Sequence, residues 1–411
     1  MRKKAIYILI TILILSSVAK ADINHYKNIL VGDRGANMAG AYIGLSDDSS
    51  GCYYNPAGVS YTVGTNLSGS VNAYHIQRST YKNAIRGKNW DRDSAELIPN
   101  FFGIIKTYGR HSFGLSVVVP DSFTQHQDQE LDNLPAMGGL EAIKRYTLNR
   151  HEQDVTTVSG ITYAYEINEF LALGMTLNYY QRNNRNENNQ TILYGNNESV
   201  GSFYNTGWLE KGIYPKLGVR WAPHRKFSFG VTLSKVFIAI SRWDFMSNIK
   251  ERGSADFIYS KVSSKAERNT PFELGVGLAL YPTESITFTF DTNLYTDPGR
   301  DAFSSYGYEP VLNFAFAAEY EINKKNVVRI GYFTNNTNAP DPTIEETRAV
   351  EHIDMWGVST GYSIHNESTS FTLGIVFSKG SGVAQIYDGV STAIPVTRYS
   401  ATGLLSTNYK L

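Results

Sequence analysis

One stretch of the chain has the spelling of a catalytic serine motif. Residues 357–361 read GVSTG, which matches the G-x-S-x-G pattern of a nucleophile elbow with Ser359 at its centre. That elbow needs a strand, a sharp turn and a helix directly after the serine. Here the alternation of apolar and polar residues simply continues through Tyr362, Ser363 and Ile364. The pattern predicts a serine inside a strand and therefore favours a protein that is not an enzyme.

The spacing of the histidines, aspartates and cysteine does not indicate a metal site or a disulfide either. The eight histidines show neither the H-x-H nor the H-E-x-x-H spacing of a zinc site. Asp47 and Asp48 are adjacent but lack the alternating Asp/Asn pattern of a calcium loop, so we interpret them as a polar turn. Cys52 is the only cysteine, which excludes an intramolecular disulfide and a cysteine-based zinc site. No cofactor is expected.

Composition and the first residues indicate an exported protein. The 38 basic and 38 acidic side chains balance, so nothing draws the chain to nucleic acid. Residues 1–4 carry three cations, residues 5–18 are almost wholly apolar, and residues 19–21 read AKA, a small-x-small cleavage site. This pattern predicts a signal peptide over residues 1–21, with an apolar core too short to span a bilayer, and a mature chain that begins at Asp22.

The stretch over residues 32–58 differs from the remainder of the chain. Its first half is crowded with small residues, which suit a backbone packed closely against other walls. These are Gly35, Ala36, Ala39, Gly40, Ala41 and Gly44. An acidic, hydroxyl-rich turn follows over residues 47–50, and after two tyrosines the chain reads NPAG over residues 55–58. Proline fixes its own backbone and biases Asn55 towards an extended conformation.

In this order, close to the expected mature N-terminus, these features resemble the plug of the FadL family of outer-membrane transporters for long-chain fatty acids and other hydrophobic compounds. The resemblance implies a fourteen-stranded barrel with an N-terminal plug, or hatch, in its lumen. It implies that the passage of substrate depends on plug residues, which here are Gly40, Ala41, Asp47, Asp48, Asn55, Pro56, Ala57 and Gly58. The apolar plug residues Met38, Tyr42, Ile43 and Leu45 are expected to supply an apolar lining.

From residue 61 onwards the chain has the period-two pattern of strands with one apolar face. Over residues 171–179 leucine, methionine and tyrosine alternate with alanine, glycine, threonine and asparagine, and residues 227–234, 272–280, 286–294 and 312–320 repeat this pattern. We count about twelve to fourteen such segments, each long enough for the ~9–11 residues that a spanning strand needs. Aromatic residues make up 13% of the chain, which also fits a transmembrane barrel.

Short and long links alternate between these segments. Residues 321–325 form a short polar link, whereas residues 335–348 form a long one, an asymmetry that is typical of outer-membrane barrels. Polar runs elsewhere predict further loops: a charged loop around residues 88–93, a long excursion over residues 120–150 with a short helix near 140–148, and an exposed loop over residues 181–197. The chain ends on leucine instead of the usual aromatic residue.

Together these observations predict an all-β protein, a transmembrane antiparallel β-barrel of about 14 strands. The expected domains are a signal peptide over 1–21, a plug over 22–60 and a barrel over 61–411. We expect a monomer in the outer membrane of a Gram-negative-type bacterium, in contact with membrane lipid, that passively takes up hydrophobic small molecules such as fatty acids or hydrocarbons. An apolar ligand requires an apolar route, which a water-filled pore does not offer.

Three alternatives stay open at this point. The expected lumen-facing residues are small and polar, as in a general porin or a structural barrel. A secretion-associated barrel of related fold with a similar Asn-Pro-Ala plug is the second alternative. An outer-membrane lipid hydrolase is the third, and the strand-like surroundings of Ser359 weigh against it.

Overall fold

The computed structural model describes residues 24–62, 64–136, 141–265, 268–300, 307–342, 350–385 and 393–410. The expected signal peptide over residues 1–21 lies outside the described residues. Among the described residues, no helix is long and apolar enough to cross a membrane.

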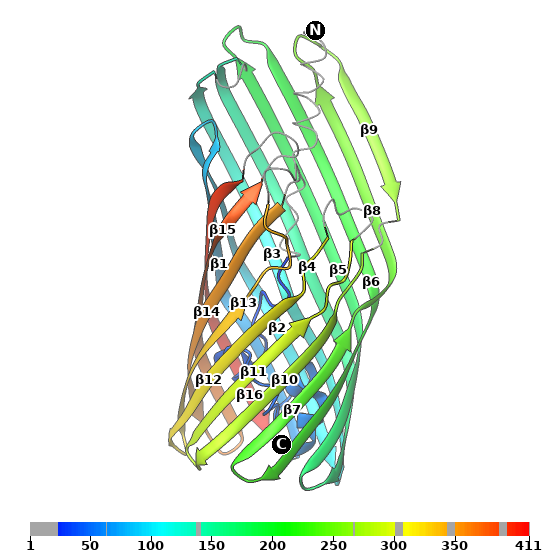
Figure 1. Ribbon diagram of the computed structural model, residues 1–411, viewed down its shortest axis with the longest axis vertical. Helices are drawn as coiled ribbons and strands as arrows, with labels where there is room; N and C mark the ends of the chain where they lie inside the picture. Colours follow the sequence, from blue (N-terminus) through cyan, green and yellow to red (C-terminus); the bar gives the residue numbers. More distant parts are fainter. Residues whose placement is uncertain are drawn as a thin grey trace.

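The chain folds into short N-terminal helices followed by one antiparallel sheet that closes on itself (Figure 1). The helices are α2 (Arg34–Asn37), α3 (Gly51–Tyr54) and the 3-10 helix η1 (Pro56–Tyr61). The strands are β1 (Thr65–Ile85), β2 (Lys88–Tyr108), β3 (His111–Leu134), β4 (Ile143–Asn168), β5 (Leu171–Tyr194), β6 (Ser199–His224), β7 (Phe227–Lys235), β8 (Phe237–Lys250), β9 (Phe257–Ser264), β10 (Phe272–Thr283), β11 (Ile286–Tyr295), β12 (Val311–Asn323), β13 (Asn326–Asn335), β14 (Val350–His365), β15 (Thr369–Gln385) and β16 (Ile394–Lys410).

The sixteen strand segments fill fourteen positions in the barrel wall. β7 and β8 are separated by Val236 alone, and both pair with β6. On their other side β10 pairs with β7 and β9 pairs with β8. β7 and β8 therefore act as one interrupted strand, and β9 and β10 act as a second one. β1 pairs with β16 and closes the barrel, which satisfies the backbone groups that a sheet edge would leave open to lipid. The predicted strand number and fold class are confirmed.

The alternation predicted from the sequence decides which side chains face outwards. On β5 Leu173, Met175 and Leu177 are exposed on the exterior, whereas Ala172 and Thr176 are buried inside. β7, β10, β11 and β12 show the same arrangement, so large apolar side chains form a band on the exterior. This band is what a lipid environment requires.

Three predicted loops are wrong because the strands continue through them. β2 already begins at Lys88, β3 and β4 occupy most of residues 120–150, and β5 extends to Tyr194. The short helix expected near 140–148 is likewise part of β4, which begins at Ile143. The polar composition misled the prediction because both faces of these extensions carry polar side chains, so they lack the alternation by which a half-apolar strand is recognised.

The extensions make one side of the barrel taller than the other, as Figure 1 shows. β3 to β6 have 24–26 residues each, whereas β10 to β13 have 10–13. We call the extended part the upper wall: residues 121–134, 143–153, 181–194, 199–213, 237–250 and 257–264. The remaining parts of the strands, which carry the apolar exterior band, form the lower wall.

Candidate functional site

Residues 24–62, here called the luminal segment, lie inside the lower wall before β1 begins at Thr65 (Figure 1). The segment contacts strands on different sides of the barrel. The Arg34 guanidinium donates to both carboxylate oxygens of Glu319 on β12, at 2.8 and 2.5 Å. Ser406 on β16 donates to Asp33 at 2.7 Å. Strands far apart in the sequence thus hold one end of the segment together.

The next part of the segment is held through its backbone. The Asp291 carboxylate on β11 accepts from the backbone N–H groups of Tyr42 and Ile43, at 2.7 and 2.8 Å. Ser359 on β14 donates to the carbonyl oxygen of Asn37 at 2.9 Å. The serine of the GVSTG motif therefore serves as an anchor for the segment and sits in the middle of a strand, where no nucleophile elbow forms.

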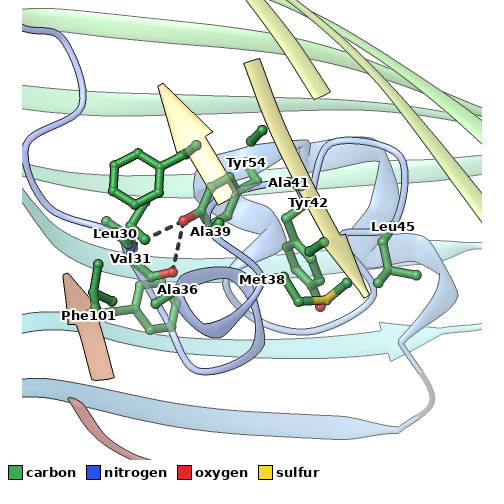
Figure 2. Close-up of a cluster of buried hydrophobic side chains, with 14 of the residues drawn as sticks. Leu30, Val31, Ala36, Met38, Ala39, Ala41, Tyr42, Leu45, Tyr54 and Phe101 are labelled. Atoms are coloured by element: carbon green, nitrogen blue, oxygen red, sulfur yellow. Dashed lines mark hydrogen bonds between the residues drawn. The ribbon is translucent and has the colours of Figure 1, made fainter. Parts of the chain in front are cut away.

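A compact apolar cluster joins the segment to the wall, and Figure 2 shows Phe101 of β2 among the segment's side chains. Tyr54 reaches back across it, and its hydroxyl lies 3.1 Å from the N–H and 3.0 Å from the carbonyl oxygen of Val31. The predicted apolar lining residues Met38, Tyr42, Ile43 and Leu45 are at most 2% exposed. Their side chains are buried within the segment and against the wall, so a ligand could meet them only if the segment moved.

The predicted acidic turn is tied to the same region. Asp47 accepts from the Arg34 guanidinium at 2.8 Å and from the Tyr42 hydroxyl at 2.9 Å. Asp48 accepts from the N–H and hydroxyl of Ser50, at 2.8 and 2.5 Å. Burial raises the pKa of Asp48 to about 6. No group of three or more potential ligands for a metal ion occurs in the described part of the chain.

Asn55 connects the luminal segment to the wall. Its amide nitrogen donates to the carbonyl oxygens of Ile43 at 2.9 Å and Val219 on β6 at 3.1 Å, and its amide oxygen accepts from Ala57 N–H at 3.1 Å. Pro56 follows as the first residue of η1. Asn55, Pro56, Ala57 and Gly58 are all buried, and so are Gly40 and Ala41 earlier in the segment. Gly40 has φ +77°, a conformation that favours glycine.

Glycines in the wall allow the segment to come this close. A Cβ added at Gly218 would overlap the Asn55 side chain, one at Gly174 would overlap the Pro56 backbone, and one at Gly230 would overlap the carbonyl of Ile43. Sequence reasoning missed these residues as part of the site. Their signal was the occurrence of glycine at inward positions of otherwise regular strands.

A cavity of about 150 Å³ lies beside the luminal segment, and we call it the tyrosine chamber. Five tyrosines line it, with the rings of Tyr26 and Tyr295 stacked at 4.2 Å. The other three are Tyr53 from the segment, Tyr180 from β5 and Tyr214 from β6. Aromatic rings with hydroxyl tips offer both apolar surface and hydrogen bonds to a ligand.

Charged side chains line the tyrosine chamber, namely Asp121, Arg182, Lys235, Arg268 and Glu273, and two lysines lie beside Glu273 without lining it. Glu273 on β10 accepts from the Tyr214 and Tyr295 hydroxyls, at 3.0 and 3.2 Å. The Lys27 and Lys216 ammonium groups lie 3.9 and 3.7 Å from this carboxylate. Two cations therefore share one anion at long distances, which leaves a positive charge available to an anionic group. Sequence reasoning had not singled out any of these residues.

Further along β4, towards its hairpin with β3, the lumen becomes strongly charged. Arg150 contacts Glu152 at 2.6 Å, and Arg92 on β2 lies 3.4 Å from the same carboxylate. Arg182 on β5 pairs with Asp154. These buried ion pairs form a layer between the tyrosine chamber and the mouth of the barrel.

Beyond this charged layer the inner face becomes apolar again, and we call this region the apolar collar. Its members come from both the tall and the short side of the barrel. They are Tyr81, Trp90, Leu134, Ile143, Tyr146, Leu148, Ile192, Tyr194, Val200, Ile353, Met355, Ala384 and Val396. These side chains are at most 8% exposed, so the collar is an apolar cluster whose members pack against one another on the inner wall.

The wall itself is interrupted between β2 and β3. The ladder runs as far as Phe101 and Val118, and beyond these residues the described chain shows one further pair, Ser94 with Gln125. The β3 register also shifts against β4 beyond Val118. A stretch of about six residues on each strand therefore lacks mutual pairing.

Other groups satisfy part of the backbone at this interruption. The Glu96 carboxylate accepts from the Ser122 hydroxyl at 2.8 Å and from the N–H of Thr124. Ile29 of the luminal segment donates its N–H to the carbonyl oxygen of Pro120 at 3.2 Å. The chamber reaches this point, because Pro120 also lines it.

No protein-family model matches the chain, and no curated protein sequence matches it. Solved structures do match over nearly the whole length. The P. putida toluene transporter TodX has a TM-score of 0.68 at 12% identity, covering 95% of this chain and 99% of that chain. A Pseudomonas aeruginosa FadL homologue has a TM-score of 0.66 at 12% identity, covering 94% and 99%. The Ralstonia pickettii toluene transporter TbuX has a TM-score of 0.61 at 13% identity, covering 93% and 99%.

These likenesses show that the chain has the fold of the FadL-type barrels. The resemblance predicted from residues 32–58 is thereby confirmed at the level of the fold. The predicted plug residues are brought together in the lumen, whereas the chamber residues come from elements that the sequence analysis treated separately.

Proposed function

We propose that this protein carries hydrophobic small molecules passively across the outer membrane, through a barrel whose lumen the luminal segment closes as a plug. The observation that carries the proposal is the tyrosine chamber, a small aromatic cavity bounded by this segment and reaching the β2–β3 interruption. A water-filled porin offers neither an aromatic cavity nor a lumen occupied by a buried, hydrogen-bonded segment.

The layers of the lumen suggest how such a molecule travels. An apolar molecule first meets the apolar collar, whose buried side chains must move apart to offer it apolar surface. The charged layer below is built from buried ion pairs, and an apolar molecule gains nothing from entering it. The chamber and the adjacent interruption give an apolar molecule a path into or through the wall that avoids the plug. The route thus selects against polar solutes.

Long-chain fatty acids are the substrate class that the charge of the chamber supports. Lys27 and Lys216 both lie beside the Glu273 carboxylate at the edge of the chamber, so a fatty acid carboxylate can pair with one of them. We infer that Lys216 is this partner, because its ammonium group also lies 5.2 and 5.6 Å above the Tyr53 and Tyr214 rings at the chamber wall.

A single-ring hydrocarbon is the second candidate, and the volume of the chamber favours it. A cavity of about 150 Å³ resembles in size the ~150 Å³ cavities that bind benzene. The neighbours named as toluene transporters have the same fold at identities of 12–13%.

Photolabelling of the purified protein tests the proposal. A fatty acid with a photoreactive group on its chain should label residues of the tyrosine chamber, and unlabelled oleate should suppress this labelling. Lys216→Gln should weaken fatty acid labelling about tenfold and leave toluene binding unchanged. Random labelling of the exterior alone would contradict a luminal site. Equal loss of both ligands would contradict the role of Lys216 as the carboxylate partner.

A further inference from the structure

Two histidines stand side by side on the exterior of the upper wall. His126 on β3 and His151 on β4 are directly opposite each other in the ladder. Their Nδ1 atoms are 3.0 Å apart, and the ring centroids are 4.3 Å apart with an interplanar angle of 33°. His126 is exposed and His151 is half-buried, so the pair is accessible from outside. Neither residue belongs to the lumen or to the proposed transport route.

The separation of the two nitrogens fits a shared metal ion. Zinc binds histidine nitrogen at ~2.0–2.1 Å, and two such bonds at angles between 90° and tetrahedral place the nitrogens ~2.9–3.4 Å apart. Imidazole also suits nickel and copper. We propose that His126 and His151 bind one divalent transition-metal ion, such as Zn²⁺, Ni²⁺ or Cu²⁺, through their Nδ1 atoms.

The ladder holds both histidines in this arrangement without the metal. β3 and β4 pair continuously on both sides of the two residues, so the backbone positions are fixed before an ion arrives. In the metal-free pair one Nδ1 carries the hydrogen and donates to the other; when the metal binds, this ring takes the tautomer with its hydrogen on Nε2, and both Nδ1 lone pairs are free for the ion. Little conformational freedom is lost on binding, which favours affinity.

Carboxylates flank the pair on the neighbouring strands. The Ser94–Gln125 pair places Asp93 of β2 next to His126, and both line an exterior groove of about 650 Å³. Glu187 of β5 lies opposite His151. Asp93 lies 3.6 Å from Arg78 and Glu187 lies 2.7 Å from Arg185, so the two carboxylates are already paired and the two histidines carry the site. No third side chain in the described residues is close enough to complete a ligand set. Water completes the coordination of the ion.

Metal titration of the full chain tests this site. The protein is purified in detergent without a polyhistidine tag, stripped with a chelator and titrated with Zn²⁺ by calorimetry and with Cu²⁺ by electron paramagnetic resonance. We expect one site per chain and a Cu²⁺ spectrum with two nitrogen ligands. His126→Ala and His151→Ala should each lower the affinity at least tenfold.

His111 provides the matched control, because it is a further exposed histidine of β3, whose Nδ1 contacts the Tyr163 hydroxyl at 2.9 Å. His111→Ala should leave the affinity unchanged. Heat-modifiable gel migration shows that each variant is folded, so a loss of binding is not a loss of structure. The proposal is overturned if the wild type binds no better than the His126/His151 double variant, or if the spectrum shows a single nitrogen ligand.

Discussion

The lower and upper halves of β5 are continuous in structure and differ in chemistry. Over residues 171–179 the exterior side chains are large and apolar, and the interior ones are small. Over residues 181–193 asparagine, glutamine, arginine and glutamate occupy most positions on both faces. Yet both halves pair in unbroken register, with β6 over residues 171–193 and with β4 over residues 172–193. Backbone hydrogen bonds to two neighbours, not side-chain patterning, keep the upper half a strand.

The contrast shows what the period-two pattern reports. Alternation arises where one face meets an apolar medium and the other does not. Where both faces of a strand are polar, the pattern disappears although the strand continues. The upper wall is therefore a sheet stabilised by ladders and ion pairs, and the lower wall is a sheet adapted to lipid outside and to the luminal segment inside. The following variants test this difference.

The largest effect is expected from the buried ion pairs of the charged layer. Arg182→Met leaves the Asp154 carboxylate buried with one remaining side-chain donor, Asn184 at 3.0 Å. Loss of one partner of a buried pair costs ~3–5 kcal/mol. Arg145→Met breaks an exposed pair with Asp132 on the same side of the barrel and should cost ~0–1 kcal/mol. Denaturant unfolding in detergent measures both, and equal costs would mean that the charged layer is not structural.

A charge placed on the exterior of β5 should distinguish its two halves. Met175→Arg introduces a charge into the apolar band and should cost ~2–4 kcal/mol if the residue lies near the bilayer midplane. Asn183→Arg, on the same face of the same strand, should cost almost nothing because this position is expected to meet water. The folded fraction after refolding into bilayers is read from gel migration. Equal assembly of the two variants would contradict the proposal that the exterior of β5 changes from lipid to water between Met175 and Asn183.

Wall glycines should matter only where the luminal segment is seated. Gly230→Val introduces a side chain where the Ile43 carbonyl now lies, and such overpacking typically costs ~1–3 kcal/mol. The barrel should still assemble, but the displaced segment should let ions through in planar bilayers. Gly207→Val on β6 faces open space and should leave conductance unchanged. If the Gly230→Val barrel conducted no more ions than the wild type, the segment would not be what closes the lumen.

The smallest effect is expected from the titration of Asp48. Burial raises the pKa of Asp48 to about 6, so the seated segment favours the protonated carboxyl. The resulting stabilisation is fully present below pH ~3.8 and is lost as pH rises through about 6. Ion leak through the wild type should therefore rise between pH 4 and pH 7, and Asp48→Asn should flatten this dependence. An identical pH profile of ion leak in the Asp48→Asn variant would show that Asp48 is not the titrating group.

The sequence predicted the lower wall well because each of its strands has an apolar exterior face that its own residues reveal. It also set residues 32–58 apart from the strands, since small residues and NPAG are local features. It could not predict what holds them, because Arg34 meets Glu319 and Tyr42 meets Asp291 only after the barrel closes. A usable signal was nevertheless present: Asp291 and Glu273 are charged residues at inward positions of apolar strands, and both face the lumen.

Selective uptake by living cells tests the central claim most directly. A bacterial host without its own channels for hydrophobic compounds would express the wild type or Gly230→Val, and the entry of labelled oleate, toluene and a trisaccharide would be measured. The account predicts that the wild type accelerates entry of oleate, toluene or both and excludes the trisaccharide, whereas Gly230→Val admits the sugar. Trisaccharide entry through the wild type at the rate of a porin, or no gain for either hydrophobic compound, would contradict it.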